Sequence, residues 1–164
     1  MTTHIIRDAQ PRDFPRVVEL NTSFVKFTSE ISLPRIAELD RLSCYHTVVE
    51  CQGQVVAFLL ALDAQQEYDS INYQWFRQNC SDFMYIDRIV IDEAQQGRGL
   101  GTLLYQDLFK FAKKQGYQRV ACEFDIQPAN VVSARFHQGF DFAQVGTQVL
   151  SKAKKTVSLQ VADV

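Results

Sequence analysis

The chain has 164 residues, of which 46% are hydrophobic and 22% are charged, and its formal net charge is −2. This length and composition are typical of one globular domain, 1–164, and exclude a disordered or collagen-like chain. The lack of a basic excess argues against a nucleic-acid partner, and the longest apolar run, VVAFLLAL, is far too short to span a membrane.

The cysteines bear on the cellular compartment of the protein, and the histidines bear on whether it binds a metal. The four cysteines form no CxxC pair, and the start MTTHIIRDAQ lacks the cationic and apolar regions of a signal peptide. We therefore expect a reducing, cytoplasmic location. The three histidines lie far apart and form no HExxH motif, so we expect no metal site.

The first part of the chain alternates between strand and helix patterns. In chain order, we expect a strand at 4–7, helices at 11–25 and 34–42, and strands at 46–51 and 54–62. Gln52 and Gly53 provide a tight turn between the last two, which predicts a hairpin. The polar stretch 63–82 has no strand period. It fits equally a binding loop or lid and a short helix near 70–78.

The second part is marked more clearly. We expect a strand at 83–91, a glycine-rich loop, a long helix, a strand at 119–124, a helix at 130–138, and strands near 142–148 and 155–162. The long helix carries apolar residues at helical spacing from Leu100 to Ala112 and can end at Gly116. The sum is a mixed α/β domain with six or seven strands.

The loop QQGRGLG, residues 95–101, lies between a predicted strand and a predicted helix. Such a loop is a general way to bind phosphate, because the amide groups at a helix start have no partner inside the helix and glycine admits an anion. Neither the GxGxxG spacing of dinucleotide-binding loops nor the GxxxxGK[ST] of P-loops is present. The loop instead reads Gln96-x-x-Gly99-x-Gly101.

This hexapeptide resembles the (Q/R)xxGx(G/A) signature of the GNAT superfamily of N-acetyltransferases. The resemblance covers nearly the whole chain, from IIRDAQPRDFPRVVELN to the closing strands, and favours a branch of predicted acetyltransferases without a generally assigned substrate. It implies a single domain with a central, mostly antiparallel sheet, a splayed parallel pair of strands and about four flanking helices. It also implies acetyl-CoA as the cosubstrate.

The resemblance implies a set of cofactor-binding residues on the strand, the loop and a later helix. They are Ile89, Val90, Ile91, Gln96, Gly97, Arg98, Gly99, Leu100, Gly101, Thr102 and Asn130. The strand backbone would bind the pantetheine arm like an added strand, and the loop amides would bind the pyrophosphate. Arg98 would add charge or lie in a solvent-exposed turn. Asn130 would cap its helix, contact the cofactor, or do both.

The family's second signature places a Gly-Phe pair after that helix. Here Asp141-Phe142 keeps the spacing from Asn130, and Asp is one of the few residues that tolerate a left-handed backbone. Gly139-Phe140 is the alternative pair. We favour the first.

Acetyl transfer to an amine calls for a base that removes a proton from the acceptor. The candidates are Asp125, Asp87 and Glu123, although Asp87 could instead pair with Arg88 or cap a bulge, and Asp125 could mark a strand end. His137 stands where many relatives carry a Tyr that protonates the leaving thiolate, or it is a hydrogen-bonded packing residue.

The expected reaction is direct attack of a primary amine on acetyl-CoA in a ternary complex. The acceptor would be a small molecule or a peptide, and the closing strands could pair in a homodimer. Two alternatives stay open at this point: a non-catalytic module that binds CoA or acyl-CoA, and an acyltransferase that uses a longer acyl-CoA.

Overall fold

The computed structural model describes residues 3–26 and 28–164. The strands are β1 (His4–Asp8), β2 (Tyr45–Cys51), β3 (Gln54–Asp63), β4 (Phe83–Ile91), β5 (Arg119–Gln127), β6 (Ala143–Leu150) and β7 (Lys155–Asp163). The α-helices of the described residues are α1 (Phe14–Thr22), α2 (Leu33–Leu42), α3 (Ile71–Asn79), α4 (Leu100–Gln115) and α5 (Val131–Gln138). Three short 3-10 helices are η1 (Pro11–Asp13), η2 (Glu93–Gln95) and η3 (Ser151–Ala153).

The strands form one mixed sheet, which confirms the predicted mixed α/β class. Their order is β1-β2-β3-β4-β5-β7-β6, and β1/β2, β2/β3, β5/β7 and β6/β7 pair antiparallel. The pair β4/β5 is parallel and joins Phe83–Tyr85 to Arg119–Ala121. The mostly antiparallel sheet with a parallel pair is therefore confirmed, and the splay of that pair stays a prediction.

The chain divides into two compact units. The first unit comprises Met1–Leu62 and Ile86–Lys110, and the second comprises Asp63–Tyr85 and Phe111–Val164. The border falls inside β4, so this strand contributes its first residues to the second unit and the rest to the first. The sequence predicts a single domain, and the joint action of the two units as one domain stays a prediction.

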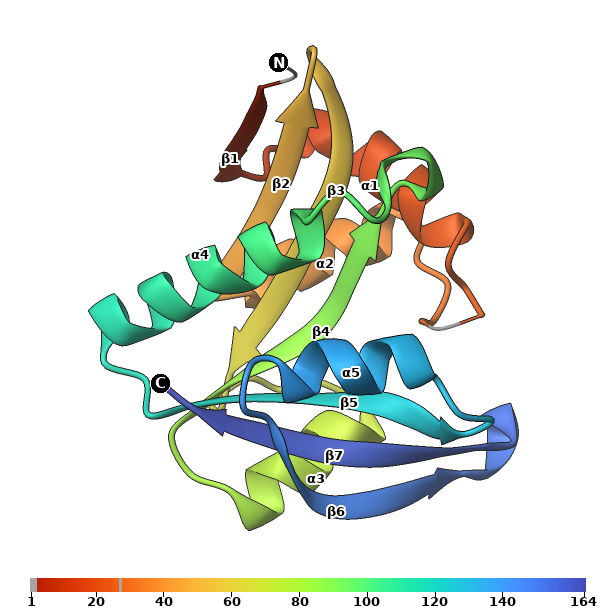
Figure 1. Ribbon diagram of the computed structural model, residues 1–164, viewed down its shortest axis with the longest axis vertical. Helices are drawn as coiled ribbons and strands as arrows, with labels where there is room; N and C mark the ends of the chain where they lie inside the picture. The colour runs from red at the N-terminus through yellow and green to blue at the C-terminus, as the bar shows by residue number, and fades with distance from the viewer. Residues whose placement is uncertain (1–2, 27) are drawn as a thin grey trace. The chain divides into compact units, whose positions relative to one another are not determined.

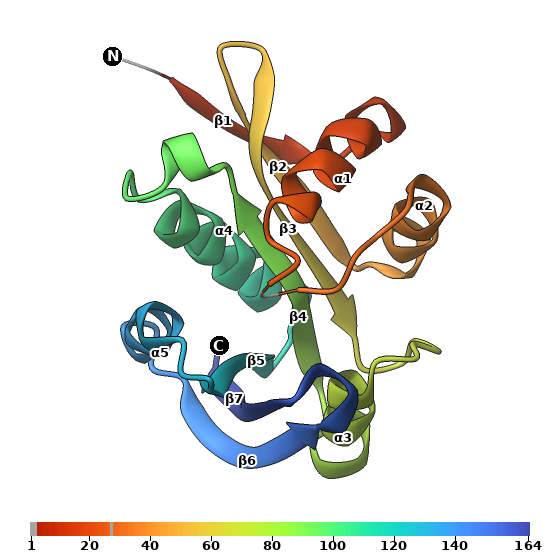
Figure 2. The same ribbon diagram turned by 90° about the vertical axis from the view of Figure 1, so that its right-hand side faces the viewer.

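In the first unit, helices cover both faces of β2 and β3. Figures 1 and 2 show α1 and α2 on one face and α4 on the other. Neighbouring residues of β2 face opposite sides, as a strand requires. His46 bonds Asp40 of α2 at 2.7 Å, whereas the hydroxyl of Tyr45 donates to Asp107 of α4 at 2.8 Å. The β2–β3 hairpin turns through Gln52 and Gly53, both with positive φ, as the sequence predicts.

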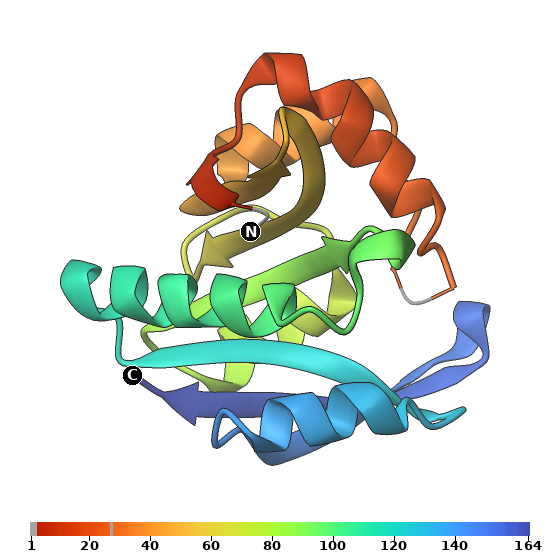
Figure 3. The ribbon, with the colours of Figure 1, turned by 45° about the horizontal axis from the view of Figure 1, so that its top comes forward.

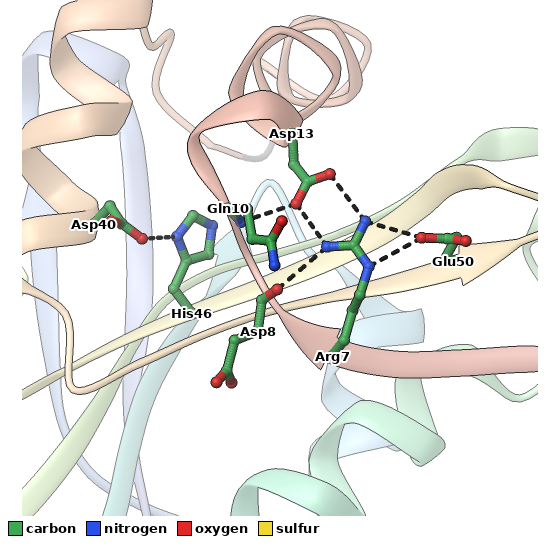
Figure 4. Close-up of polar contacts among 7 residues, drawn as sticks. All are labelled: Arg7, Asp8, Gln10, Asp13, Asp40, His46 and Glu50. Atoms are coloured by element: carbon green, nitrogen blue, oxygen red, sulfur yellow. Dashed lines mark hydrogen bonds and ion pairs between the residues drawn. The ribbon is translucent and has the colours of Figure 1, made fainter.

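An arginine anchors the N-terminal strand of the first unit (Figure 4). Arg7 donates to both carboxylate oxygens of Asp13, at 2.7 and 2.9 Å, and to Glu50 at 2.9 Å. Asp13 also accepts from the amide of Gln10. The Arg7 guanidinium holds the pKa of the Asp13 carboxyl below its usual value. Charge-assisted, two-pronged bonds of this kind fix geometry, so they set the path from β1 into α1.

His46 is a buried titratable group in the same unit (Figure 4). Its ring stacks on Phe14, with centroids 6.1 Å apart, and meets Phe58 in a T-shaped contact with centroids 6.3 Å apart. Within the described residues its Nε2 atom is buried and has no hydrogen-bond partner. Burial lowers the pKa of His46 below its ordinary value of 6.5, against the opposing effect of Asp40.

This lowered pKa makes stability depend on pH. The unfolded chain takes up a proton at His46 as the pH falls through 6.5, whereas the folded protein resists it, so acidification favours unfolding. We expect the free energy of unfolding to fall between about pH 7.5 and about pH 5.5. His46→Phe should reduce that fall, and urea denaturation at both pH values measures it. An equal fall in the variant would show that His46 is not responsible, and His137, whose pKa burial also lowers, would account for it.

The second unit also carries one helix on each face of its strands. In Figure 2, α5 and α3 lie on opposite sides of β5, β7 and β6. The ring of Trp75, on α3, packs so closely on β6 that a Cβ atom on Gly146 would lie 2.6 Å from it. The stretch 63–82 thus contains a helix, capped by the side chain of Ser70, rather than a continuous loop.

The chain after α5 turns through a left-handed residue. Asp141 has a φ of 61°, and Phe142, which follows it, is buried. Gly139, in the alternative pair, has an ordinary φ of −64°. The backbone therefore agrees with the choice of Asp141-Phe142 over Gly139-Phe140.

Candidate functional site

The glycine loop follows the C-terminal end of β4 in the first unit. Figure 3 shows the chain leaving β4, turning through this loop and returning as α4. Gly97 and Gly99 have φ values of +73° and +80°, which residues with a side chain rarely adopt. A Cβ atom built on either would meet nothing within 4 Å. Both glycines therefore border open space that a ligand can use.

The loop ends in a helix start with available amide groups. The amide of Leu103 donates to the carbonyl of Gly99 at 2.9 Å, which begins the helical bonding of α4. The amides of Leu100, Gly101 and Thr102 come before it, where a helix offers them no internal partner and the helix dipole is positive. The predicted residues thus fit an anionic group such as a pyrophosphate. The exposed Arg98 lies in the same loop.

Gln96 fixes the start of the loop on β4. Its side-chain amide donates to the carbonyl of Ile91 at 3.4 Å, and its backbone amide donates to Glu93 at 3.4 Å. The strand residues before it alternate, with Val90 buried and with Ile89 and Ile91 partly exposed. The contact of these residues with a cofactor stays a prediction.

Two residues that the sequence analysis missed hold this loop in place. Asp92 caps η2 by accepting from the amide of Ala94 at 3.0 Å, and its own amide donates to Val56 on β3 at 2.8 Å. Arg16 of α1 bonds Asp92 at 2.5 Å and the carbonyl of Val55 at 3.1 Å. Arg16 thereby ties α1 to the junction of strand and loop.

Removing this tie should weaken cofactor binding. We expect Arg16→Met to raise the Kd for CoA roughly three- to tenfold, because a loop held less firmly must be ordered on binding. The protein itself should lose less than about 1 kcal/mol, since the ion pair is partly exposed. Titration calorimetry measures the change in Kd.

The matched control is Arg35→Met on α2. Arg35 pairs with Glu38 at 2.7 Å, just as Arg16 pairs with Glu19 at 2.8 Å, both three residues on along a helix. The control should bind CoA like the wild type. Equal weakening in both variants would mean that the effect does not come from the loop.

Asp87, one of the three candidate bases, lies on β4 in a buried ion pair. Its carboxylate accepts from Nε of Arg88 at 2.7 Å, and both side chains are 4% exposed. Arg88 also donates to Asn21 and to the carbonyl of Ser29, both at 3.0 Å. Asp87 therefore belongs to a network that holds the segment after α1, as the structural alternative for this residue anticipated.

Glu123, another candidate base, lies on β5 in the second unit, and two neutral donors bond one of its oxygens. Oε1 accepts from the hydroxyl of Tyr85 at 2.8 Å and from the side-chain amide of Asn72 at 3.0 Å. Asn72 in turn accepts from the side-chain amide of Gln148 at 2.8 Å. Glu123 is partly buried as a residue, and its second carboxylate oxygen, Oε2, is buried.

Asp125 and Asn130 lie near the end of β5. Asp125 forms an ion pair with Lys155 of β7 at 2.9 Å. Asn130 caps α5: its side-chain oxygen accepts from the amide of Ser133 at 3.1 Å, and its backbone amide donates to the carbonyl of Asp125. The predicted capping role of Asn130 is confirmed, and its contact with a cofactor stays a prediction.

His137 is packed among aromatic rings. It is 5% exposed, its ring stacks on Phe124 with centroids 5.3 Å apart, and it meets Phe142 in a T-shaped contact with centroids 5.1 Å apart. Its Nδ1 donates to the carbonyl of Ser133 at 2.7 Å. Burial lowers the pKa of His137, so the ring is neutral at neutral pH. These contacts match the packing interpretation, and a catalytic role stays a prediction.

The two units thus hold different parts of the predicted set. The first contains the loop 96–102, the strand residues 89–91 and Asp87, and the second contains Glu123, Asp125, Asn130 and His137. Among residues 3–26 and 28–164, no three His, Cys, Asp or Glu side chains gather as metal ligands would, and no helix is long and apolar enough to span a membrane.

Comparison with protein families identifies one match over most of the chain. The model of the acetyltransferase (GNAT) family matches residues 4–142. A search of curated proteins finds no match.

Solved structures give the same fold at low identity. Ard1 from Thermoplasma volcanium superposes with a TM-score of 0.78 at 17% identity, covering 98% of this chain and 97% of that one. The ribosomal-protein-S18-alanine N-acetyltransferase from Escherichia coli gives 0.75 at 12%, covering 99% and 94%. YncA, a putative acetyltransferase from Salmonella typhimurium solved with its cofactor acetyl-CoA, gives 0.76 at 18%, covering 98% and 94%.

Proposed function

Because the chain belongs to the acetyltransferase (GNAT) family, we propose that it transfers the acetyl group of acetyl-CoA to a primary amine by direct attack in a ternary complex. The family supports acetyl transfer in general, and a structural neighbour carries acetyl-CoA as its cofactor. We also propose the class of acceptor and the role of each residue in the reaction.

The observation that carries the proposal is the built loop at the end of β4. Left-handed Gly97 and Gly99 keep the surface free of side chains, and the first amides of α4 point their dipoles out of the helix start. A pyrophosphate needs such a set of donors. The backbone of Ile89–Ile91 would bind the amide-rich pantetheine arm, and Asn130 would contact the cofactor from the start of α5.

We propose Glu123 as the base for the acceptor amine. The ion pairs of Asp87 with Arg88 and of Asp125 with Lys155 already neutralise those two carboxylates. Glu123 is instead oriented by a phenol and an amide that both donate to Oε1, so Oε2, which is buried in this structure, would be the oxygen that takes the proton. A carboxylate in this setting can accept the ammonium proton, directly or through water.

Other residues would supply the remaining steps. The thioester provides the activated acyl group, and a backbone amide of β4 would stabilise the oxyanion that develops on its carbonyl. Burial raises the pKa of the Cys122 thiol well above its ordinary value, which supports direct attack by the amine over an acyl-cysteine intermediate. His137 remains the proposed proton donor to the leaving thiolate, and this role requires its Nδ1 proton to leave the carbonyl of Ser133 or the ring to take up a second proton.

The acceptor is a small molecule or a peptide that carries a primary amine. A single functional domain, a cytoplasmic location and a homodimer paired through the closing strands complete the proposal.

Calorimetric titration with acetyl-CoA and with CoA, followed by a thiol-release assay, tests it. The amine panel should contain an N-terminal peptide, lysine, other amino acids and spermidine. Binding together with amine-dependent thiol release is the expected result. Binding without release on any amine would favour a non-catalytic CoA-binding module, and release only with longer acyl-CoA would favour a different acyl donor. The absence of binding would overturn the proposal.

A further inference from the structure

A chain of hydrogen bonds in the second unit leads from its β6 strand to Glu123. The side-chain amide of Gln148 donates to Oδ1 of Asn72 at 2.8 Å, and Nδ2 of Asn72 donates to Glu123 at 3.0 Å. Asn72 is 7% exposed. Because Gln148 occupies the oxygen end of the Asn72 amide, the nitrogen end must face the carboxylate.

The helix that carries Asn72 is fixed independently of this bond. Trp75, one turn further along α3, packs on Gly146 so closely that even a methyl group there would force the ring to move. Tyr73, next to Asn72, is fully buried, and its hydroxyl donates to the carbonyl of Asp63 at 2.6 Å. The Asn72 amide therefore reaches Glu123 from a rigid support.

We propose that Asn72 is a positioning residue that, together with Tyr85, holds Oε1 of Glu123 and so leaves the carboxylate aimed at the acceptor amine. This inference rests on the proposed function, in which Glu123 is the base. Two donors on one oxygen fix the side-chain rotamer of Glu123. Gln148 acts indirectly, because its bond to Asn72 fixes the direction of the Asn72 amide.

Ionisable groups near Glu123 include Tyr85 on β4, the adjacent Cys122, and Asp125, which lies two residues along β5 and pairs with Lys155 of β7. Removing the Asn72 donor disfavours the charged form of the carboxylate. Glu123 should therefore titrate at higher pH in Asn72→Ala than in the wild type, which ¹³C NMR of the labelled carboxyl group measures without any acceptor. An unchanged titration would overturn the proposal.

The kinetic test uses the amine of the panel that the wild type acetylates fastest. We expect Asn72→Ala to lower kcat about tenfold with little change in the KM for acetyl-CoA, because a misplaced catalytic group slows the chemical step. Glu123→Gln should lower kcat about 100-fold, and the double variant should match Glu123→Gln alone. Asn79→Ala is the control, since Asn79 lies exposed on the same helix and donates to the carbonyl of Trp75.

The outcomes separate the two claims. Full activity of Glu123→Gln would overturn the role of Glu123 as base, and with it this inference. A slow Glu123→Gln enzyme with an unaffected Asn72→Ala enzyme would overturn the inference and leave the base assignment intact. Multiplying effects in the double variant would also overturn it, because Asn72 would then act on something other than Glu123. Gln148→Ala should repeat the Asn72→Ala effect in weaker form, and it leaves α3 in place should Asn72→Ala fail to fold.

Discussion

Replacing Gly99 with valine should abolish acetyl-CoA binding, with a Kd raised more than about 100-fold. Gly99 has a φ of +80°, where a β-branched residue is strained by roughly 1–2 kcal/mol, so the loop would change its path. Any side chain that did keep the path would project into the space next to the amides of α4. Titration calorimetry measures the loss.

Gly53→Val provides the matched control. Gly53 has a φ of +78°, and it too meets nothing within 4 Å of a built Cβ atom. It lies in the β2–β3 turn, so the strain on the backbone is alike and only the place differs. This variant should lose similar stability and keep its affinity for acetyl-CoA. If Gly99→Val bound acetyl-CoA with wild-type affinity, the loop would not be part of the cofactor site.

Replacing Glu123 with glutamine should lower kcat by about 100-fold or more, because a positioned general base contributes a factor of this size. The amide oxygen of glutamine can still accept from Tyr85 and from Asn72, so the local structure should persist. Thiol release at saturating acetyl-CoA measures kcat. The Kd for acetyl-CoA should stay at the wild-type value.

Asp125→Asn and Asp87→Asn serve as comparisons for that substitution. Each keeps the shape of the side chain and removes the charge that pairs with Lys155 or with Arg88. We expect both to retain most of kcat, with the buried Asp87 variant losing stability, because Arg88 would then keep a buried charge without its carboxylate. If only Asp125→Asn strongly lowered kcat, the base would be Asp125 rather than Glu123.

The sequence predicted those parts of the fold whose signals are local. The helix from Leu100 follows from apolar spacing, the β2–β3 turn from Gln52-Gly53, and the left-handed residue before Phe142 from the tolerance of Asp141 for that conformation. The helix α3 stayed undecided, because Ile71–Asn79 is a short stretch within a long polar segment. Its place on the sheet involves contacts between distant parts of the chain, such as that of Trp75 with Gly146.

The same distinction divides the candidate site. The loop 96–102 is continuous in the chain, so its spacing could be read directly. The ranking of the three carboxylates could not, because their partners are mostly remote. Glu123 bonds Asn72 across 51 residues and Tyr85 across 38, and Asn72 bonds Gln148 across 76. No pattern in the sequence links residues at such separations, and Arg16 and Asp92 were missed for the same reason.

Product analysis tests the central claim most directly. Incubation of the protein with acetyl-CoA and the panel amines, followed by mass spectrometry, should show an N-acetylated amine formed in equal amount to free CoA. The product should be absent with Gly99→Val and strongly reduced with Glu123→Gln. Equal product formation by the wild type and both variants, or release of CoA without any acetylated amine, would contradict the account.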